Sequence, residues 1–356
     1  MENNHLTYFK IENFKKFDSL EVNDIGQFNL IVGDNNVGKT CLLEALLFDE
    51  KGEVLISNFH MGLSKRGMDF KAVKIPYDID GRIVFDYEFP QGHYFTWVEQ
   101  NKNQAIRFTF HTLLEKNKSV SISPISIGGN KQLDKSSELK VTFTNHVVLI
   151  NDKTFNIYNY DENILDFPMI SFNDSPLEEE TIKLYESLKT KNDKKNLIEV
   201  LKIIDRRLVG IDFRENFEDL KSVFLISYED KEEYFPLNTL GDGFKRIFYI
   251  VLKMLSLKGK RILIDEIEIG IHYSKMKDFW VNIMKVCKEL DVQLFATTHS
   301  QECTETYIEA SNLLNYNNEI RLVKLEESTN KDKIYASTFT YNQISAGLDS
   351  NVELRG

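Results

Sequence analysis

Residues 33–40 have the types and the spacing of a loop that holds phosphate groups. They match the pattern G-x-x-x-x-G-K-[ST] at every fixed position. Backbone N–H groups of such a loop, together with the positive end of the helix that follows, face the phosphates. The Lys39 ammonium would contact the β and γ phosphates, and the Thr40 hydroxyl would ligate Mg²⁺. The expected ligand is ATP with Mg²⁺, and the expected nucleotide-binding residues are Asn35, Asn36, Gly38, Lys39 and Thr40.

The residues on either side of this loop must form the elements that position it. Residues 28–32 are an apolar run that predicts a short buried strand. Residues 41–47 carry apolar side chains at helical spacing. A strand, a glycine-bearing loop and a helix in this order are the context that the phosphate-binding pattern requires. The alternative, a glycine-rich turn without a ligand, does not account for this agreement.

A second apolar run ends in two acidic residues that suit the metal and the water of a hydrolysis reaction. Residues 262–264 predict a strand, with Asp265 at its carboxyl end and Glu266 one residue further on. Asp265 is expected to reach the Mg²⁺ shell, and Glu266 to orient or deprotonate the attacking water. An apolar run before Asp-Glu is also common in structural contexts, so this assignment depends on the phosphate loop upstream.

A glycine-bearing helix start lies shortly before the acidic strand. Gly241, Asp242 and Gly243 precede residues 247–257, an apolar helical stretch that leads into the strand. This order is typical of ATPases of the ABC class. In them the glycine-bearing turn binds the γ phosphate held by the opposite protomer, through its N–H groups and helix dipole. The alternative is a simple helix cap.

His299 is the expected sensor of the γ phosphate. Residues 292–298 predict a buried strand that ends just before it. A lone histidine is usually a packed or exposed side chain. This one follows a strand after the acidic pair, where ABC ATPases place their switch histidine, which favours the functional role.

The loop after the acidic pair is expected to face across a dimer. It covers residues 268–274, and Ser274 is predicted to cap a helix that runs on through Val286. His272 in this loop is either a surface residue or a cross-dimer contact, and the sequence leaves both open.

The rest of the sequence predicts two additions to one nucleotide-binding core. Apolar and polar residues alternate over residues 82–89, which indicates antiparallel strands, and Ser175 to Glu178 have the signature of a helix start. The expected fold class is α/β, an ABC-type P-loop ATPase with a mixed or parallel core sheet flanked by helices. The expected parts of this single module (residues 1–356) are a core lobe of residues 1–75 and 207–356, an antiparallel β lobe of residues 76–170 and a short helical insertion of residues 175–206.

Three smaller features complete the predicted organisation. Residues 13–17 could bring an aromatic ring and a cation near the nucleotide base. Residues 319–325 and 334–339 predict a closing hairpin. Between the two helices of the insertion lies a small basic group that is either a solvated turn or a contact for DNA or a partner, formed by Lys189, Lys191, Lys194 and Lys195.

Bulk composition limits the class of protein. The chain has 356 residues and a formal charge of -11, which argues against a surface that coats nucleic acid non-specifically. No apolar run approaches the ~20 residues that span a bilayer, and the first residues lack the pattern of a signal peptide. A cytoplasmic protein without a membrane partner is expected. Three scattered cysteines predict neither a disulfide framework nor a zinc site.

The motifs together resemble the OLD-like (overcoming lysogenisation defect) ATPases, an ABC-class AAA family of bacteria that stands beside RecF and the SMC proteins. The resemblance spans nearly the whole chain and rests on residues 11–15, 33–40, 236–246, 264–268 and 297–300. It implies a homodimer or a larger ATP-dependent assembly, in many cases within an anti-phage system. Such ATPases carry a fused TOPRIM nuclease or act with a separately encoded effector. No fused nuclease is expected here, so the resemblance implies an effector, such as a nuclease, from another gene.

The sequence departs from the ABC pattern at two places. Gly241 and Asp242 stand where transporter-type signatures have Ser and Gly, so backbone N–H groups would have to replace the missing hydroxyl and hydrolysis is expected to be slow. The glutamine that ABC ATPases use to couple nucleotide to their moving lobe has no assigned position, although Gln91 and Gln100 are candidates.

Three functions remain open from the sequence. The favoured one is an ATP-hydrolysing dimer that controls a separate effector in anti-phage defence. The second is a RecF-like repair ATPase that binds DNA directly, against which the acidic charge weighs. The third is a regulatory module that binds ATP with little turnover.

Overall fold

The computed structural model describes a defined set of residues of this chain. The set comprises residues 5–49, 54–55, 58, 61–62, 82–90, 92–100, 108–116, 119–126, 141–143, 147–150, 153–156, 165–171, 178–202, 205–215, 222–329 and 333–349. Gln91 and residues 175–177, on which two predictions rested, lie outside it, as does the side chain of Gln100.

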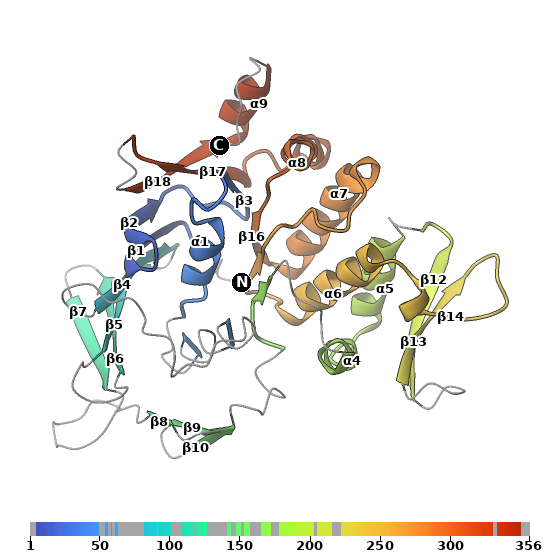
Figure 1. Cartoon of the computed structure of the whole chain (residues 1–356), viewed down its shortest axis with the longest axis horizontal. Helices are drawn as coiled ribbons and strands as arrows, with labels where there is room; N and C mark the ends of the chain where they lie inside the picture. Colours follow the sequence, from blue (N-terminus) through green and yellow to red (C-terminus); the bar gives the residue numbers. More distant parts are fainter. Residues whose placement is uncertain are drawn as a thin grey trace.

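A six-stranded mixed sheet forms the centre of the molecule (Figure 1). Its strands, in spatial order, are β11 (Met169–Ile170), β15 (Arg261–Ile264), β16 (Gln293–Thr297), β3 (Phe28–Gly33), β17 (Ile320–Glu327) and β18 (Ile334–Thr340). Neighbours from β11 to β17 pair in parallel, and β18 is antiparallel to β17. Because the carboxyl ends of parallel strands meet at one edge of a sheet, the loops that follow β3, β15 and β16 lie together.

A second six-stranded sheet is antiparallel and lies on the left of Figure 1. Its strands, in spatial order, are β2 (Phe17–Val22), β1 (Tyr8–Phe14), β4 (Arg82–Phe89), β5 (Gly92–Gln100), β6 (Phe108–Lys116) and β7 (Ser119–Ser126). The antiparallel pairing predicted for residues 82–89 is confirmed, and Ile83, Phe85 and Tyr87 are buried as their alternation indicates. A smaller antiparallel sheet consists of β8 (Val141–Phe143), β9 (Val147–Ile150) and β10 (Lys153–Asn156).

Helices pack on the central sheet, and Figure 1 shows α7 and α8 across β16 from α1. Helices with both ends described include α1 (Lys39–Ala45), α4 (Glu178–Glu186), α5 (Lys191–Leu201), α6 (Asp242–Ser256), α7 (Tyr273–Leu290), α8 (Gln301–Leu314) and α9 (Tyr341–Asp349). A three-stranded antiparallel sheet and a short 3₁₀ helix precede α6. They are β12 (Leu208–Glu215), β13 (Ser222–Tyr228), β14 (Phe235–Pro236) and the 3₁₀ helix Leu237–Thr239.

Successive residues of the central strands face two different apolar cores. Leu30 and Val32 of β3 pack into the core formed with α5, α6, α7 and α8. Ile31, between them, packs into the core formed with α1 and the strands β1, β2 and β4. This alternation is the period-2 geometry of a strand that is covered on both faces. The sheet is therefore the middle layer, which holds the ends of β3, β15 and β16 rigidly.

A buried charged cluster joins the helix α4 to the helix α6. The Lys253 Nζ atom lies 3.2 Å from the Glu180 Oε1 atom, and the Tyr249 hydroxyl donates to the same oxygen at 2.5 Å. The side chains of Lys253 and Glu180 are 0% and 3% exposed. Buried charges are tolerated only when they are paired and hydrogen-bonded. The cluster thus requires α4 to remain docked on α6.

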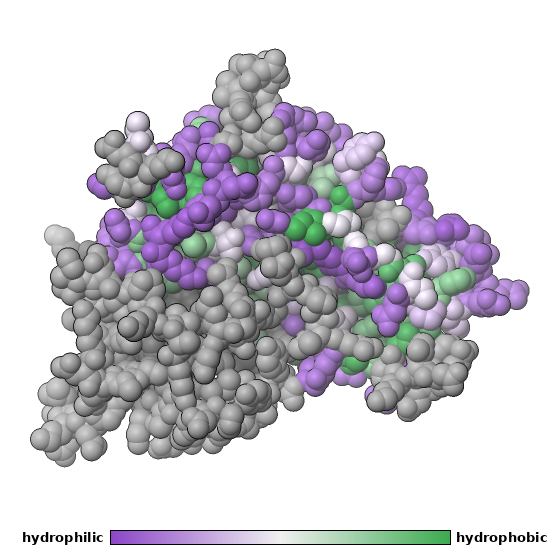
Figure 2. All heavy atoms as spheres, in the orientation of Figure 1, coloured by the Kyte–Doolittle hydropathy of each residue, from purple (hydrophilic) through white to green (hydrophobic). Residues whose placement is uncertain are grey.

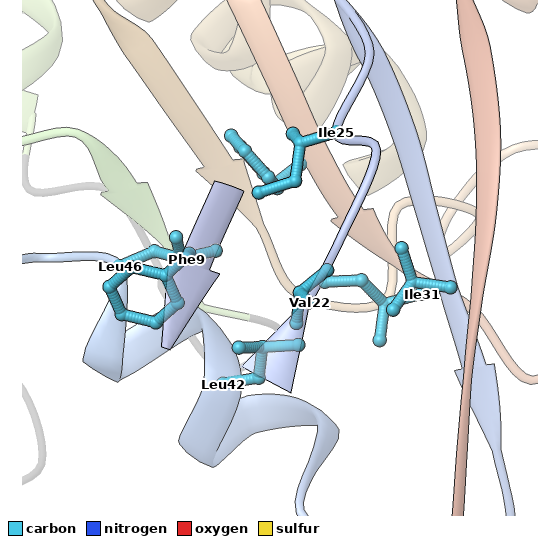
Figure 3. Close-up of a pocket in the computed structure, with 8 residues that line it drawn as sticks. Phe9, Val22, Ile25, Ile31, Leu42 and Leu46 are labelled. Carbon is cyan, nitrogen blue, oxygen red and sulfur yellow. The ribbon is translucent and has the colours of Figure 1, made fainter. Parts of the chain in front are cut away.

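A small apolar cavity of about 10 Å³ lies between α1, the end of β2 and the central sheet (Figure 3). Its lining consists of Phe9, Val22, Ile25, Ile31, Leu42, Leu46, Phe295 and Val323. A cavity of this size is at the lower limit for one water molecule, and an apolar lining offers that water no partner. We therefore regard it as a gap in packing and not as a ligand site.

Neighbouring side chains cap α5 and α7 at their N-termini. α5 begins at Lys191, because the Thr190 side chain accepts from the Asp193 N–H and the Asp193 carboxylate accepts from the Thr190 N–H. α7 begins at Tyr273, with His272 as its N-cap, and ends at Leu290. The prediction that Ser274 caps this helix is wrong, because its N–H donates to the His272 ring instead.

Three sheet pairings bear on the remaining sequence predictions. The closing hairpin is confirmed as β17 and β18, but β17 also joins the central sheet beside β3. β1 and β2, from the N-terminal part, pair within the antiparallel sheet, and β11 at residues 169–170 pairs with β15 in the central one. The division of the chain into a core, a β lobe and an insertion stays a prediction.

The face seen in Figure 2 is mainly hydrophilic over the described residues, with hydrophobic atoms in small separate areas. Among the described residues, no helix is both long and apolar enough to cross a membrane.

Candidate functional site

The loop between β3 and α1 has the backbone shape that a phosphate group requires. Gly38 is the N-cap of α1 with φ 111°, and Asn36 also has a positive φ of 66°. A side chain at Gly38 would be strained by that φ and would meet the Phe17 ring at 3.0 Å. The N-cap makes no side-chain hydrogen bond, so the first N–H groups of α1 remain available to an anion. Asn35 and Asn36 are exposed on this loop.

Lys39 is folded back over the same loop. Its Nζ atom donates to the Gly33 carbonyl at 2.6 Å and to the Asp34 carbonyl at 2.9 Å, and lies 3.4 Å from the His299 Nδ1 atom. Burial lowers the pKa of the Lys39 ammonium, while the nearby carboxylates of the acidic pair oppose that shift. The ammonium is thereby held at the edge of the loop where a terminal phosphate would lie.

Thr40 and Asp265 meet across the gap between α1 and β15. The Thr40 hydroxyl donates to the Asp265 carboxylate, at 3.0 Å from Oδ2 and 3.3 Å from Oδ1. The Thr297 hydroxyl, at the end of β16, donates to Asp265 Oδ1 at 2.6 Å. One hydroxyl and one carboxylate are oxygen donors of the kind that hold Mg²⁺ together with phosphate oxygens and water. The residues present therefore fit that ion, although the described residues contain no cluster of three or more His, Cys, Asp or Glu side chains suited to a metal.

Glu266 follows Asp265 in an unusual backbone conformation. Its φ is 48°, in the left-handed region that few residues other than glycine adopt. Its N–H donates to the Thr297 hydroxyl at 2.8 Å. Its carbonyl accepts from the Nη2 atom of Arg246 on α6 at 3.0 Å, and so does the Asp265 carbonyl at 2.9 Å.

The Glu266 carboxylate and the His299 ring face each other beside Lys39. The His299 Nε2 atom lies 3.6 Å from Glu266 Oε1, and both side chains are partly exposed. Burial raises the pKa of the Glu266 carboxyl above its ordinary value, with Asp265 and Glu268 adding to the shift and His299 and Lys39 opposing it. A carboxylate with a raised pKa, partly open to solvent, suits proton transfer from water.

Glu268 braces the strand end that carries His299. Its Oε1 atom accepts from the His299 backbone N–H at 2.9 Å. Its Oε2 atom is buried without a hydrogen-bond partner among the described residues. His299 lies two residues after the end of β16, and this hydrogen bond fixes its backbone there. Glu268 therefore sets the position of the His299 ring opposite Glu266.

The predicted signature loop lies at the start of α6. Gly241 is the N-cap of this helix, and the Asp242 side chain is fully exposed except for its contact with Lys245 at 3.1 Å. Gly243 packs against Gly270, so closely that a Cβ atom at Gly243 would be 2.0 Å from the Gly270 carbonyl oxygen. Contact of this loop with the nucleotide of a second chain stays a prediction.

The turn between β1 and β2 places a cation at the phosphate loop, while the aromatic rings on either side of this turn are buried. The Lys16 ammonium donates to the Asn36 carbonyl in the phosphate loop. Phe14 and Phe17 are only 5% and 2% exposed, because both pack into the core beneath α1. Lys16 thus places a cation at the phosphate loop, and a contact of that cation with the nucleotide base stays a prediction. The prediction of an aromatic contact to the base is wrong for these two rings.

The structure brings the residues predicted from three separate motifs into one place. Contacts link Lys39 to His299, Thr40 to Asp265, and Glu266 to His299. Sequence reasoning assigned no role to three residues that position this set, namely Thr297, Glu268 and Arg246. None of the three has a local signal in the sequence, because each contacts a group that is at least 19 residues away along the chain.

Known proteins resemble this chain in sequence and in fold. A protein of Helicobacter pylori (strain ATCC 700392 / 26695) named ATP/GTP phosphatase is 24% identical over 328 residues, which cover 83% of this chain and 85% of the relative. The crystal structure of an SMC head bound to the C-winged helix domain of ScpA matches with a TM-score of 0.50 and 12% identity, over 94% of this chain and 98% of that chain. The SMC head domain from Thermotoga maritima matches with a TM-score of 0.44 and 12% identity, over 95% and 99%.

The first of these structures shows the fold class. This chain has the α/β fold of the SMC head, an ABC-type ATPase fold with a mixed sheet and flanking helices, as the sequence predicts. A family profile described as "AAA domain, putative AbiEii toxin, Type IV TA system" matches residues 28–303, from β3 to the first turn of α8. Since this match covers more than half of the 356 residues and all the motifs of the site, the chain belongs to that AAA-domain family.

Proposed function

We propose that the chain binds ATP with Mg²⁺, hydrolyses it slowly and forms a homodimer around it. The observation that carries the proposal is the hydrogen bond between Thr40 and Asp265, at 3.0 Å. It joins the phosphate loop to the acidic strand at the position where a metal bound to a triphosphate needs oxygen ligands. The name of the Helicobacter pylori relative, an ATP/GTP phosphatase, supports phosphate release as the reaction.

Each residue of the site has a role in this chemistry. Bound Mg²⁺ would neutralise phosphate charge, with Thr40 and Asp265 as its protein ligands. Lys39 holds the β and γ phosphates, and the α1 N–H groups hold their oxygens. Glu266 takes a proton from the attacking water, and His299 contacts the γ phosphate beside it. The shape of the loop around Asn35, Asn36 and Gly38 keeps these groups aligned, so catalysis depends mainly on positioning.

The second chain and the effector belong to the proposal as well. Gly241, Asp242 and Gly243 would present N–H groups to the triphosphate of the partner chain, without the hydroxyl of transporter-type signatures. Exposed Tyr273 and Ile269, at 71% and 36%, supply apolar surface next to the site that a second chain could cover. The OLD-like resemblance and the family's description as a putative toxin support control of a separately encoded effector, such as a nuclease, in anti-phage defence.

The direct test measures phosphate release and assembly together. We expect Mg²⁺-dependent release of phosphate from ATP by the wild-type chain, and a shift from monomer to dimer in size-exclusion chromatography when ATP is added. Binding of ATP without phosphate release would favour the regulatory alternative with little turnover. Absence of ATP binding would overturn the proposal.

Direct DNA binding, as in a RecF-like repair ATPase, is the second candidate. The observation in its favour is a group of exposed lysines at the start of α5, formed by Lys191, Lys194 and Lys195. A fluorescence titration of duplex DNA at rising salt tests it. Tight, salt-dependent binding would place this function first, and weak binding would leave effector control as the better account.

The pH dependence of hydrolysis should reflect the raised pKa of Glu266. Its carboxyl must be ionised to accept a proton, so kcat falls as pH falls through that pKa. Because burial raises this pKa, the acid limb lies at a higher pH than for an ordinary glutamate. A kcat profile measured from pH 4.5 to 8 at saturating ATP checks this. A flat profile over that range would contradict the role of Glu266.

A matched pair of variants tests how Glu268 positions His299. Glu268→Ala removes the acceptor of the His299 N–H, so kcat should fall about tenfold, the effect of one lost hydrogen bond to a charged group. Glu268→Gln keeps a carbonyl oxygen at the same place and should stay within about threefold of wild type. Steady-state phosphate release at saturating ATP measures both. Equal losses in the two variants would mean that the charge of Glu268, and not its hydrogen bond, matters.

A further inference from the structure

Arg246 connects α6 to the acidic pair across the site. It lies in the second turn of α6, five residues after the Gly241 N-cap. Its Nη2 atom donates to the Asp265 carbonyl at 2.9 Å and to the Glu266 carbonyl at 3.0 Å. These carbonyls are 19 and 20 residues away along the chain, so the contact is a tertiary one.

The two carbonyls belong to the peptide planes on either side of the Glu266 Cα atom. A single donor that holds both oxygens therefore restricts φ and ψ of Glu266 together. Thr297 holds the N–H groups of the same two planes. Its hydroxyl accepts from the Glu266 N–H at 2.8 Å, and its carbonyl accepts from the Ile267 N–H at 3.0 Å. Arg246 and Thr297 thus determine the Glu266 backbone from opposite sides.

This restraint is needed because Glu266 is in the left-handed region, with φ 48°. A non-glycine residue stays in that region only when its surroundings over-determine the conformation. Rotation of φ back to the ordinary helical or extended range would swing the carboxylate about the Cα atom and away from its place opposite the His299 ring. Loss of the Arg246 contacts therefore acts chiefly on the position of the Glu266 carboxylate, because the Asp265 side chain keeps its hydrogen bonds from Thr40 and Thr297.

The distance between α6 and the acidic loop is also fixed. Gly243, one turn before Arg246, packs its backbone against the backbone of Gly270. A Cβ atom at Gly270 would lie 3.0 Å from the Gly243 Cα atom, so the two segments are in direct contact. Arg246 is on the same helix as Gly243. The contact between the two glycines therefore also fixes how far the guanidinium lies from the Asp265 and Glu266 carbonyls.

We propose that Arg246 is the positioning residue of Glu266, and that through it the α6 turn facing the partner's triphosphate controls the hydrolytic carboxylate. This inference rests on the proposed function. It assigns Arg246 to the hydrolysis step, because the two carbonyls that accept from it flank the Glu266 Cα atom.

The test compares Arg246→Met with Arg261→Met. Arg261 is a matched control, because it is also partly buried and its Nη2 atom also donates to a backbone carbonyl, that of Phe48 at 2.7 Å. It lies at the opposite end of β15, away from Asp265. The measurements are kcat for phosphate release, the Kd for Mg-ATP by calorimetry, and the melting temperature. Arg246→Lys is included because it keeps one donor and serves as the test if the methionine variant does not fold.

We expect Arg246→Met to lower kcat by about 30-fold or more, as misplacement of a catalytic group does, with the Kd within about twofold of wild type. Arg246→Lys should give an intermediate kcat. Arg261→Met should lower the melting temperature and leave kcat unchanged. In a Glu266→Gln background, Arg246→Met should cause no further loss, because it acts only through that carboxylate.

Three results would overturn the inference. They are an unchanged kcat in both Arg246 variants, a fall of similar size in Arg261→Met, and a further full loss in the Glu266→Gln background. Each of these presupposes turnover by the wild-type chain. If the wild-type chain itself releases no phosphate, the proposed function fails first, and the inference fails with it.

Discussion

Lys39→Ala is expected to weaken Mg-ATP binding by at least about 100-fold, which corresponds to about 3 kcal/mol. The buried ammonium supplies the positive charge for the β and γ phosphates, and its hydrogen bonds to the Gly33 and Asp34 carbonyls hold the loop closed around them. The substitution removes both contributions. Isothermal titration calorimetry with Mg-ATP measures the change directly, and phosphate release should disappear with it.

Lys260→Ala is the control for this experiment. Lys260 is half exposed and pairs with Asp166 on the surface, just before β15 begins. Exposed ion pairs contribute little, so this variant should bind Mg-ATP as the wild type does. Equal affinity of the wild-type and Lys39→Ala chains would show that the loop over residues 33–40 does not hold a triphosphate.

Glu266→Gln is expected to lower kcat by about 1,000-fold while ATP binding persists. Glutamine has nearly the same size as glutamate but cannot take a proton from water, and the backbone contacts of this residue with Arg246 and Thr297 do not involve its side chain. The ATP complex therefore accumulates. Steady-state phosphate release at saturating ATP gives kcat, and size-exclusion chromatography in Mg-ATP should show a stable dimer.

Glu309→Gln provides the comparison. Glu309 is an exposed carboxylate on α8 that pairs with Lys277, so its neutralisation should alter neither hydrolysis nor assembly. A Glu266→Gln chain that still turns over ATP at the wild-type rate would remove Glu266 as the proton acceptor. A variant that binds ATP, does not hydrolyse it and stays monomeric would instead contradict the dimer.

The residues proposed to contact the nucleotide could be predicted from the sequence because their signals are local. Lys39 and Thr40 are recognised by spacing within eight residues, and Asp265 and Glu266 by the apolar strand before them. The parallel order of β15, β16 and β3 then brings the three strand ends together, which follows from the general geometry of parallel sheets.

The supporting residues could not be predicted in the same way. Arg246, Thr297 and Glu268 act through backbone groups that are 19 to 31 residues distant, and a backbone carbonyl or N–H cannot be recognised from residue types. The cap of α7 was assigned to Ser274 because serine is a preferred cap. In the structure His272 is the N-cap, and its ring Nδ1 atom accepts from the Ser274 N–H.

Sheet membership was also hidden from local reasoning. β11 is only two residues long, and its place beside β15 depends on a pairing with residues 263–264. The sequence analysis does not predict β12, β13, β14 or α9. β14 has only two residues and α9 nine, and the buried Leu208 and Ile211 of β12 do not follow the alternation of a half-buried strand. Their positions follow from packing against α5, α6 and α8.

The ion pair between Lys253 and Glu180 makes the loss of helix α4 depend on the residue at position 253. A chain shortened by removal of α4 would lose the carboxylate that lies 3.2 Å from the buried Lys253 ammonium, and removal of one partner of a buried ion pair costs about 3–5 kcal/mol. Such a deletion therefore has to be accompanied by a second change, at Lys253 itself. A shorter relative built on this scaffold should carry an apolar residue there, and a relative with a basic residue there should keep the insertion.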